Sequence, residues 1–292
     1  MPTLPPPVPL SQIHCPETTA RALLQRYDFF LLDAYGVLVH AAGAMPGAAQ
    51  FLVDVKNAGK DFMVVTNDAS RLQTTAASFY QGYGLDVTPA QALTSGQLLK
   101  PFFKTVGLAG ATCMGLGPED SFTYVRDAGG IPIAPDANTH IDAVVLCDDA
   151  GYPFLQTMDA ILSNLCRHLD RGQIPKLIVP NPDVIYPSGE SGFGFTSGAA
   201  ALLLETALAQ RYPQLRPTFS RLGKPFGPMF REVQRKCPGK ELVMIGDQLE
   251  TDIVGARTQG IDAALVDTGI TKWETTCLLY TSPSPRDKIH DL

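Results

Sequence analysis

The sequence predicts an α/β protein built on parallel sheets. Short apolar strands alternate with helical segments along most of the 292 residues, which is typical of strand–helix–strand units. Three predicted strands end on a polar residue, namely Asp33, Thr66 and Asp247. A second run of strands and helices interrupts the first between residues 94 and 217. We therefore expect one α/β domain with another α/β domain inserted into it.

The first elements belong to the interrupted domain. Its predicted helices are 18–25, 45–60 and 74–83, and its predicted strands are 28–33 and 61–66. The helix within residues 45–60 is marked at both ends, because Pro46 lies near its start and Gly59 lies just after its end. The strand DFMVVT ends at Thr66 and is followed by NDAS, which predicts a turn or a helix cap.

The inserted domain shows the same alternation. Its predicted strands are 111–117, 143–147 and 176–180, and its predicted helices are 120–128, 154–170 and 198–210. The interrupted domain resumes after a GKP turn, with helices at 228–236 and 252–259 and strands at 241–247 and 262–267. We expect the outer domain to comprise residues 16–93 and 218–276, and the inserted domain to comprise residues 94–217.

The two ends of the chain lie outside these domains. Residues 1–15 begin with MPTLPPPVPL, which predicts an extended, proline-stiffened arm and lacks the basic start and long apolar core of a signal peptide. Residues 277–292 begin with CLLYTSPSPRD, which has no helical or strand periodicity. This stretch closely resembles the translation of a common sequencing-library adaptor. We therefore expect the natural sequence to stop near Thr276 and residues 277–292 to be a non-native tail; the alternative is a genuine disordered tail.

Composition argues against several classes of partner. The net charge is −6 and the isoelectric point is near 5.3, so no basic stripe is offered to a nucleic acid or an anionic membrane. No apolar run approaches the ~18 residues that a membrane helix needs. The six cysteines are scattered without a Cys-x-x-Cys pair. This favours reduced thiols in a cytoplasmic protein over disulfides or a zinc site.

The polar residues at the strand ends predict a site for a phosphate ester. In an open parallel sheet, ligands bind beyond the carboxyl ends of the strands. A carboxylate that closes an apolar strand is costly in a core unless it is paired or bound to a metal. Asp33 could attack phosphorus, the Thr66 hydroxyl could hold a phosphoryl oxygen, and Lys224, which follows a glycine, could neutralise both anions.

Two further aspartates complete a predicted metal site. Asp247 would supply a hard oxygen ligand for Mg²⁺, which prefers one or two carboxylates plus waters and substrate oxygens. In GDQLETD, Asp252 lies about one helical turn beyond Asp247 and could reach the same cation directly or through water.

Each of these residues also has an ordinary structural explanation. Asp33 and Asp247 could be helix caps or loop carboxylates, and Thr66 an ordinary strand-end threonine. Lys224 could simply be solvated after a turn, and Asp252 could be a carboxylate favoured by a helix dipole. The matched strand ends favour the catalytic interpretation.

The order LLDAYGVL, VVTNDAS, LGKP and MIGDQLETD resembles the four motifs of the haloacid dehalogenase (HAD) superfamily of hydrolases. The insertion follows the second motif and contains NPDVIYP, as in the class IIA proteins, which carry a C2 cap and resemble sugar and nucleotide phosphatases. The similarity spans roughly Tyr27 to Thr268. It implies a Rossmann-like core, an acyl-phosphate intermediate on Asp33, and Mg²⁺ held by Asp33, the backbone carbonyl of Tyr35 and Asp247. A small phosphorylated metabolite would be the substrate, and a homodimer is common among relatives.

Tyr35 departs from the family pattern. Phosphatases of this superfamily usually have a second aspartate at this position, which protonates the leaving oxygen and later activates water. A phenol with a pKa near 10 can donate a hydrogen bond but is a poor base near neutral pH, and loss of a general acid–base group costs about 10²–10⁴ in rate. Tyr35 is therefore either a positioned hydrogen-bond donor or filler in a site that has lost activity.

The same tyrosine raises two alternatives to a phosphatase. The superfamily's dehalogenases also have Asp-x-Tyr, but they work without metal, lack the GD…TD pair, and carry their cap after the first motif, where this chain has only residues 39–45. A non-catalytic phosphometabolite-binding or regulatory protein would retain the metal and phosphate ligands. We expect a Mg²⁺-dependent phosphatase of low or unusual activity.

Three more residues are candidate substrate contacts. Asn67 could orient the loop after the second motif by side-chain hydrogen bonds or could cap the next helix. Asn181-Pro182-Asp183 is a turn signal. Resemblance to the family suggests that Asn181 and Asp183 lie on a cap loop over the active site.

Overall fold

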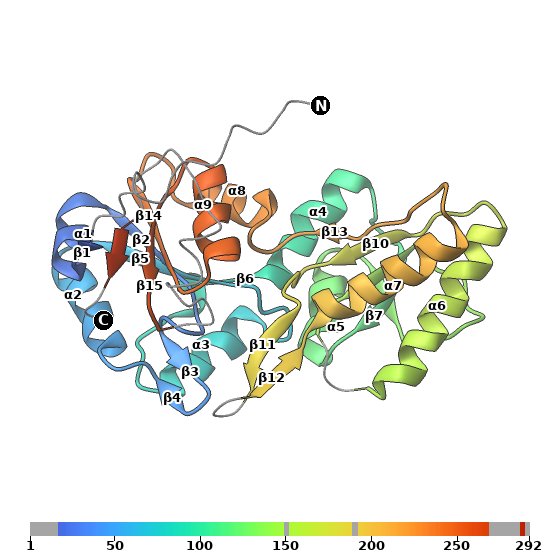
Figure 1. Ribbon diagram of the computed structural model, residues 1–292, viewed down its shortest axis with the longest axis horizontal. Helices are drawn as coiled ribbons and strands as arrows, with labels where there is room; N and C mark the ends of the chain where they lie inside the picture. The colour runs from blue at the N-terminus through green and yellow to red at the C-terminus, as the bar shows by residue number, and fades with distance from the viewer. Residues whose placement is uncertain (1–16, 149–151, 189–191, 269–286, 290–292) are drawn as a thin grey trace, which may run out of the picture. The chain divides into compact units, whose positions relative to one another are not determined.

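The structure is a computed structural model, and it describes residues 17–148, 152–188, 192–268 and 287–289 (Figure 1). The chain divides into two compact units. The first comprises Met1–Val65, Tyr80–Asp86 and Gln234–Leu292, and the second comprises Thr66–Phe79 and Val87–Val233. The predicted α/β class is confirmed. The residue boundaries expected for the core and the cap remain predictions, and the proline-rich arm lies outside the described residues.

The first unit is built on a parallel sheet with strand order β1-β16-β15-β14-β2-β5. In this order the strands are Glu17–Thr18, Asp287–Ile289, Asp262–Val266, Leu242–Gly246, Phe29–Leu32 and Asp61–Thr66. The central strands β2 and β14 are buried almost throughout. This matches their nearly continuous apolar sequences, as expected for parallel strands covered on both faces.

Part of the predicted non-native tail has regular structure. Asp287–Ile289 forms β16, which pairs with β15 and β1 through backbone hydrogen bonds. Backbone pairing requires no alternation of apolar side chains, so the sequence pattern did not indicate this strand. The remainder of residues 277–292 lies outside the described part of the chain.

Two helices of the first unit show how its sequence sets its packing. Helix α1 (Ala20–Arg26) begins where the Thr19 hydroxyl accepts a hydrogen bond from the Ala22 amide at 3.2 Å, which is an ordinary N-cap. Helix α2 (Ala48–Asn57) buries Phe51, whose ring meets Phe30 of β2 edge-on at 5.8 Å. A helix with one apolar face is thereby fixed against the sheet that carries the site.

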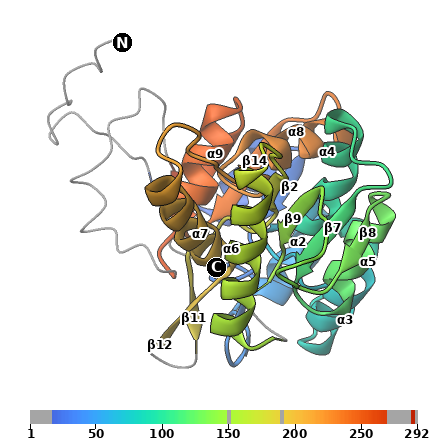
Figure 2. The same ribbon diagram turned by 90° about the vertical axis from the view of Figure 1, so that its right-hand side faces the viewer.

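The second unit contains a five-stranded sheet with the order β13-β10-β9-β7-β8, and all of its printed pairings are parallel. In this order the strands are Ser220–Arg221, Lys176–Val179, Ala143–Leu146, Thr112–Leu116 and Ile131–Ile133. Helices α6 (Phe154–Asp170) and α7 (Ser197–Arg211) cover one face, and α4 (Leu99–Val106) and α5 (Glu119–Asp127) lie on the other (Figure 2). The unit is therefore a three-layer α/β/α sandwich.

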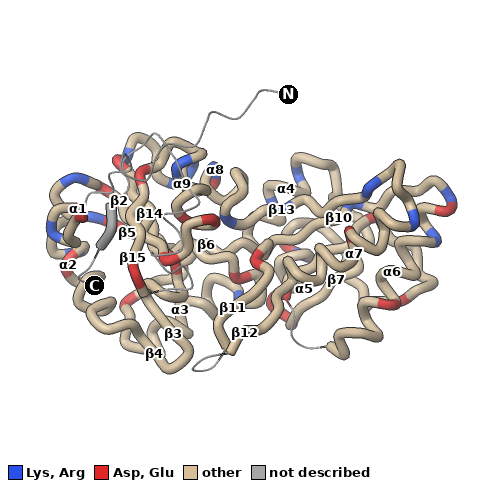
Figure 3. Tube along the Cα trace, viewed as in Figure 1, with Lys and Arg blue, Asp and Glu red and all other residues tan. Residues whose placement is uncertain are grey.

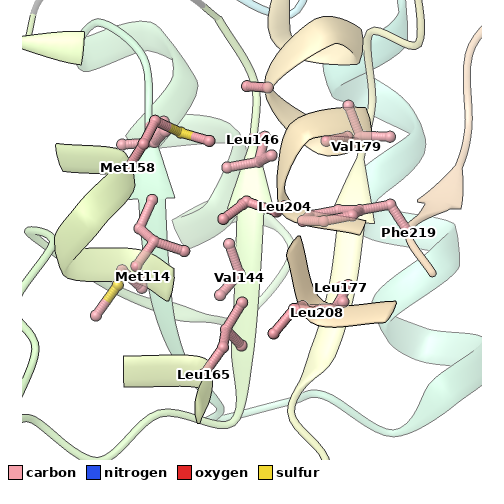
Figure 4. Close-up of a cluster of buried hydrophobic side chains, with 14 of the residues drawn as sticks. Met114, Val144, Leu146, Met158, Leu165, Leu177, Val179, Leu204, Leu208 and Phe219 are labelled. Carbon is pink, nitrogen blue, oxygen red and sulfur yellow. The ribbon is translucent and has the colours of Figure 1, made fainter. Parts of the chain in front are cut away.

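An apolar cluster of described residues joins the first of these helix layers to the sheet. Alternate residues of β7, β9 and β10 point to the same face, and there they meet leucines of α6 and α7 (Figure 4). Its members include Met114, Leu116, Val144, Leu146, Leu177, Val179, Leu165, Leu204 and Leu208. Helix α6 has the bounds predicted from the sequence, because this apolar face marks its whole length.

Several smaller elements complete the described chain. They are β3 (Val39–His40), β4 (Gly43–Ala44), α3 (Gln73–Gly82), η2 (Pro89–Gln91), β6 (Ala92–Thr94), η3 (Ser95–Leu98), β11 (Ile185–Ser188), β12 (Gly192–Phe195), α8 (Gly227–Lys236), the π-helical turn η4 (Leu249–Ile253) and α9 (Val254–Thr258). Strands β11 and β12 form an antiparallel hairpin. The helix predicted at 252–259 is corrected: it starts earlier, with η4, and α9 is short.

Charged residues are interspersed along the described trace, and no element there carries a continuous basic stripe (Figure 3). Among the described residues, no helix combines the length and apolar character needed to cross a bilayer. The four described cysteines, Cys113, Cys147, Cys166 and Cys237, are free thiols.

Candidate active site

Two parallel neighbours, β2 and β14, carry the first two aspartates of the site. Leu32 lies opposite Ile245, and the Asp33 amide donates a hydrogen bond to the Ile245 carbonyl at 2.9 Å. Asp33 follows β2 directly, and Asp247 follows β14. Because the strands run in the same direction, both carboxylates lie at the same edge of the sheet.

Asp252 joins them from the π-helical turn that follows β14. Its amide donates to the Gln248 carbonyl at 3.0 Å, and its carboxylate accepts from the Gln248 amide at 3.1 Å. These two bonds tie the residue to the start of its own turn. Its carboxylate therefore lies near β14 instead of extending away along the helix.

The three carboxylates form a compact buried cluster. Asp33, Asp247 and Asp252 are 7%, 3% and 0% exposed, and each offers a ligand oxygen within 4.8 Å of the others. Like charges at this separation disfavour one another in a buried setting, and a divalent cation between them would relieve that repulsion. The hard oxygen donors fit Mg²⁺.

Two glycines make room for this cluster. A Cβ atom on Gly36 would lie closer than 3.0 Å to the Asp247 carboxyl group, and one on Gly246 would lie equally close to the Asp252 carboxyl group. Gly36 also has a φ of +81°, which L side chains rarely adopt. Sequence analysis did not identify either glycine, although each lies beside a motif aspartate or within the first motif.

The loop that carries Tyr35 is a tight turn after β2. The amides of Leu38 and Val39 both donate to the Ala34 carbonyl at 2.9 Å, and the Ala34 amide donates to Asp33 Oδ1 at 2.7 Å. The last of these bonds orients the Asp33 carboxylate. Tyr35 is 39% exposed, so its phenol is accessible to solvent.

The second unit brings together another group of predicted site residues around Asn67. The Asn67 Oδ1 atom accepts from the Lys224 amide at 2.7 Å, and its Nδ2 donates to the Lys224 carbonyl at 2.9 Å and to Asp183 Oδ1 at 2.8 Å. Asn67 and Lys224 are buried. The Thr66 hydroxyl, in the same unit, accepts from the Asp68 amide at 3.2 Å.

The Asn181–Asp183 turn is held by its own side chain and by α7. The Asp183 amide donates to Asn181 Oδ1 at 3.0 Å, which closes an Asx turn. The Asn181 carbonyl accepts from the Ser197 hydroxyl at 3.0 Å, and the Asp183 carbonyl accepts from the Gly198 amide at 3.0 Å. A rigid turn thus presents Asp183 to Asn67.

Two residues that contact Asn67, Ser95 and Gly223, were not predicted from the sequence. The Ser95 hydroxyl donates to the Asn67 carbonyl at 2.6 Å, and Gly223 has no space for a Cβ atom beside Asn67 Oδ1. Asp68 accepts from the Ser70 amide and pairs with Arg71 at 2.8 Å. No local pattern in the sequence distinguishes Ser95; the glycine before Lys224 was the one available signal.

The fold is that of a HAD-type hydrolase. Sequence models agree: one described as haloacid dehalogenase-like hydrolase matches residues 30–130, and one described as HAD-hydrolase-like matches residues 221–287. A crystal structure described as a possible sugar phosphatase of the HAD superfamily, from Cytophaga hutchinsonii, superposes with a TM-score of 0.76 at 28% identity. It covers 89% of this chain and 92% of that one.

Named relatives align with this sequence over most of their length. The dihydroxyacetone phosphatase of Corynebacterium glutamicum is 30% identical over 243 residues, which are 82% of this chain and 81% of that protein. Human chronophin is 28% identical over 267 residues, which are 87% of this chain and 86% of that protein. The chain belongs to the haloacid dehalogenase-like hydrolases, in the class IIA, phosphatase-like group, and is an enzyme of the hydrolase class.

Proposed function

We propose that the protein is a Mg²⁺-dependent phosphatase that acts on a small phosphomonoester through an aspartyl-phosphate on Asp33. The observation that carries this proposal is the buried cluster of Asp33, Asp247 and Asp252 at one edge of the first unit's sheet. Sugar phosphates are the first substrate class to test, because relatives with similar sequences are named dihydroxyacetone phosphatase and acid sugar phosphatase.

Asp33 is the nucleophile in this proposal. Its carboxylate attacks phosphorus, the bond from phosphorus to the ester oxygen breaks, and the leaving oxygen takes up a proton from solvent water. Water then attacks the acyl-phosphate, which releases inorganic phosphate and restores the Asp33 carboxylate. The Ala34 amide keeps the carboxylate oriented through its bond to Oδ1.

The remaining predicted residues have charge-stabilising roles. Asp33, Asp247, Asp252 and the Tyr35 carbonyl would hold Mg²⁺, which supplies positive charge to the phosphoryl oxygens when bound. Thr66 and Lys224 would donate to those oxygens, in keeping with their polar side chains in a largely buried setting. The predicted substrate contacts of Asn181 and Asp183 remain part of the proposal, whereas the Asn67 amide is bonded to Lys224 and Asp183.

Tyr35 sets the substrate preference in this proposal. Its phenol can donate a hydrogen bond to a leaving oxygen but cannot serve as an efficient base near neutral pH. Esters whose leaving groups need little protonation, such as aryl phosphates, are therefore favoured over alkyl phosphates.

The test is phosphate release from a panel of aryl, sugar and other alkyl phosphates in the presence of Mg²⁺. Wild-type protein should release phosphate, and Asp33→Asn should abolish the release. Asp54→Asn, on the exposed face of α2, is the matched control and should retain wild-type rates. Tight binding of esters without Asp33-dependent release would favour the non-catalytic binder, and metal-independent halide release from haloacids would favour the dehalogenase.

A homodimer and a cytoplasmic location are also part of the proposal. Light scattering coupled to size exclusion measures the first directly. A mass equal to that of one chain at micromolar concentration would reject the dimer.

A further inference from the structure

Asn67 lies at the meeting point of three segments of the second unit. Its own segment follows β5, Lys224 belongs to the GKP turn, and Asp183 belongs to the turn before β11. The side-chain amide bonds both polar groups of the Lys224 backbone and one carboxylate oxygen of Asp183, at 2.7 to 2.9 Å. One small side chain thus connects residues that are 116 and 157 positions away in the sequence.

The orientation of the Asn67 amide is fixed by its partners. The Lys224 amide can only donate, so it must face Oδ1. The Lys224 carbonyl and the Asp183 carboxylate can only accept, so both must face Nδ2. A rotation of the amide by half a turn would set oxygen against two acceptors and nitrogen against a donor. Asp183 therefore reinforces the orientation in which Asn67 holds Lys224.

The surroundings leave the amide no alternative partner in solvent. Asn67 is 4% exposed, and its carbonyl accepts from the Ser95 hydroxyl at 2.6 Å, which holds its backbone. A Cβ atom on Gly223 would lie closer than 3.0 Å to Asn67 Oδ1 and to the Pro180 carbonyl. The glycine before Lys224 is thus the residue that allows the Lys224 backbone to approach the amide so closely.

We propose that Asn67 is a positioning residue for Lys224, with Asp183 as the group that orients it, and not a substrate ligand. Both Nδ2 hydrogens of Asn67 are committed to protein acceptors, so neither is offered to a phosphate. Asn67 acts by holding the Lys224 backbone at its amide and its carbonyl, which fixes the point from which the ammonium group extends. This inference rests on the proposed function, in which Lys224 contacts the phosphoryl group.

Exchanging the amide and the carboxylate between positions 67 and 183 tests whether Asp183 orients Asn67 and thereby Lys224. Asn67→Asp keeps the shape and the acceptor for the Lys224 amide, but sets a second carboxylate oxygen against Asp183 and the Lys224 carbonyl. We expect kcat/KM for p-nitrophenyl phosphate to fall about 10- to 100-fold, less than the about 10²–10³ seen when a charge-stabilising donor is removed outright. Adding Asp183→Asn supplies a donor to the new carboxylate. The double variant should recover at least half of the decrease in log(kcat/KM).

A second double-mutant cycle, with Lys224→Met, distinguishes an effect through Lys224 from a general loss of structure or activity. Residues that act as one unit show non-additive effects. In a Lys224→Met background, Asn67→Asp should therefore lower kcat/KM by less than about 2-fold. Asn57→Asp, at the exposed end of α2, is the matched substitution elsewhere and should leave kcat/KM unchanged in both backgrounds. If Asn67→Asp does not fold, Asn67→Ser, which removes the Nδ2 donors without adding charge, takes its place in the second cycle.

The outcomes distinguish this inference from the proposed function. An equal loss in the wild-type and Lys224→Met backgrounds, or no recovery with Asp183→Asn, overturns the positioning role. If wild-type protein releases no phosphate from any ester, the proposed function fails, and the same cycles are then measured by calorimetric binding of inorganic phosphate. Lys224-dependent binding that follows the expected pattern would support the positioning role. Binding that is absent, or independent of Lys224, would overturn it.

Discussion

Tyr35 occupies the position at which a carboxylate would usually assist the leaving oxygen, and its chemistry can be tested by one substitution. We expect Tyr35→Asp to raise kcat for alkyl phosphates by about 10²-fold, within the about 10²–10⁴ that a general acid–base group contributes. Aryl phosphates should change little, because their leaving groups need less protonation. Steady-state rates with glycerol phosphate and p-nitrophenyl phosphate provide the comparison. An equal gain for both esters would reject the proposed substrate preference.

Gly246 permits the approach of Asp252, and adding one methyl group should disturb it. We expect Gly246→Ala to lower the free energy of unfolding by about 1–3 kcal/mol, the usual range for overpacking, and to weaken Mg²⁺ binding, because the new Cβ would overlap the Asp252 carboxyl group. Urea unfolding and Mg²⁺ titration measure the two effects.

Gly82→Ala is the control for this substitution. Gly82 is the last residue of α3, and a Cβ atom there would meet nothing within 4 Å. It should be neutral or stabilising by up to about 1 kcal/mol, through the lower entropy of the unfolded chain. Equal effects of the two substitutions would show that the position of the Asp252 carboxylate does not require a glycine at position 246.

At the scale of elements, two buried thiols lie in or next to strands of the second unit, and their ionisation couples to folding. Burial raises the pKa of Cys147, just after β9, and of Cys113 in β7 from an ordinary value of 9.0 to about 12. The unfolded chain therefore loses these protons first as pH rises. The stabilisation is complete below about pH 9 and is lost progressively up to about pH 12.

We expect Cys147→Ala to flatten this alkaline decline. The free energy of unfolding should fall less steeply above pH 9, by up to about 1.4 kcal/mol per pH unit. Val145→Ala shortens a buried side chain of the same strand without removing a titrating group. It should lower stability by the same amount at every pH. Urea titrations between pH 8 and 11 give both slopes, and identical slopes for wild type and Cys147→Ala would contradict the coupling.

The elements with strong local signals could be predicted from sequence. Helix α6 was located at its observed bounds because its apolar face continues for its full length, and β2 and β14 were found because they are short apolar runs. The hairpin β11–β12 was missed. Its residues are largely exposed, so no alternation toward a core marks it, and Pro187 and the glycines of β12 are typical of loops.

The site was predictable to the extent that it follows strand ends. Asp33 and Asp247 close neighbouring parallel strands, so their placement at one edge follows from topology. The approach of Asp252 to the same cation site was expected from its spacing after Asp247, but the π-helical turn and the need for a glycine at position 246 were not. The bonds from Asn67 to Lys224 and Asp183 depend on tertiary packing between distant segments, and no local pattern encodes them.

For the whole molecule, the division into two units predicts how Mg²⁺ affects unfolding. Asp33, Asp247 and Asp252 all belong to the first unit. We therefore expect calorimetry to resolve more than one unfolding transition. Mg²⁺ should raise the midpoint temperature only of the transition in which the first unit unfolds. At a Mg²⁺ concentration of about 100 times Kd, the free energy of unfolding of the first unit should increase by ~2.7 kcal/mol, and EDTA should remove this increase.

Variants identify the transition that responds. Asp247→Asn should abolish the response to Mg²⁺, while Asp54→Asn on α2 should retain it. A Mg²⁺ shift that survives in Asp247→Asn, or that is equal in all transitions, would contradict the assignment of the metal ligands.

The order of the strands in the first unit also has a consequence for protein synthesis. Strand β2 leaves the ribosome before the second unit, but β14, which lies beside β2, is translated only after all of the second unit. The second unit can therefore complete its own five-stranded sheet while the first is still unfinished, as domains commonly fold in turn on the ribosome. Asp33 can meet Asp247 only after β14 has been translated. A nascent chain stalled before β14 would carry the nucleophile without its metal-binding partners.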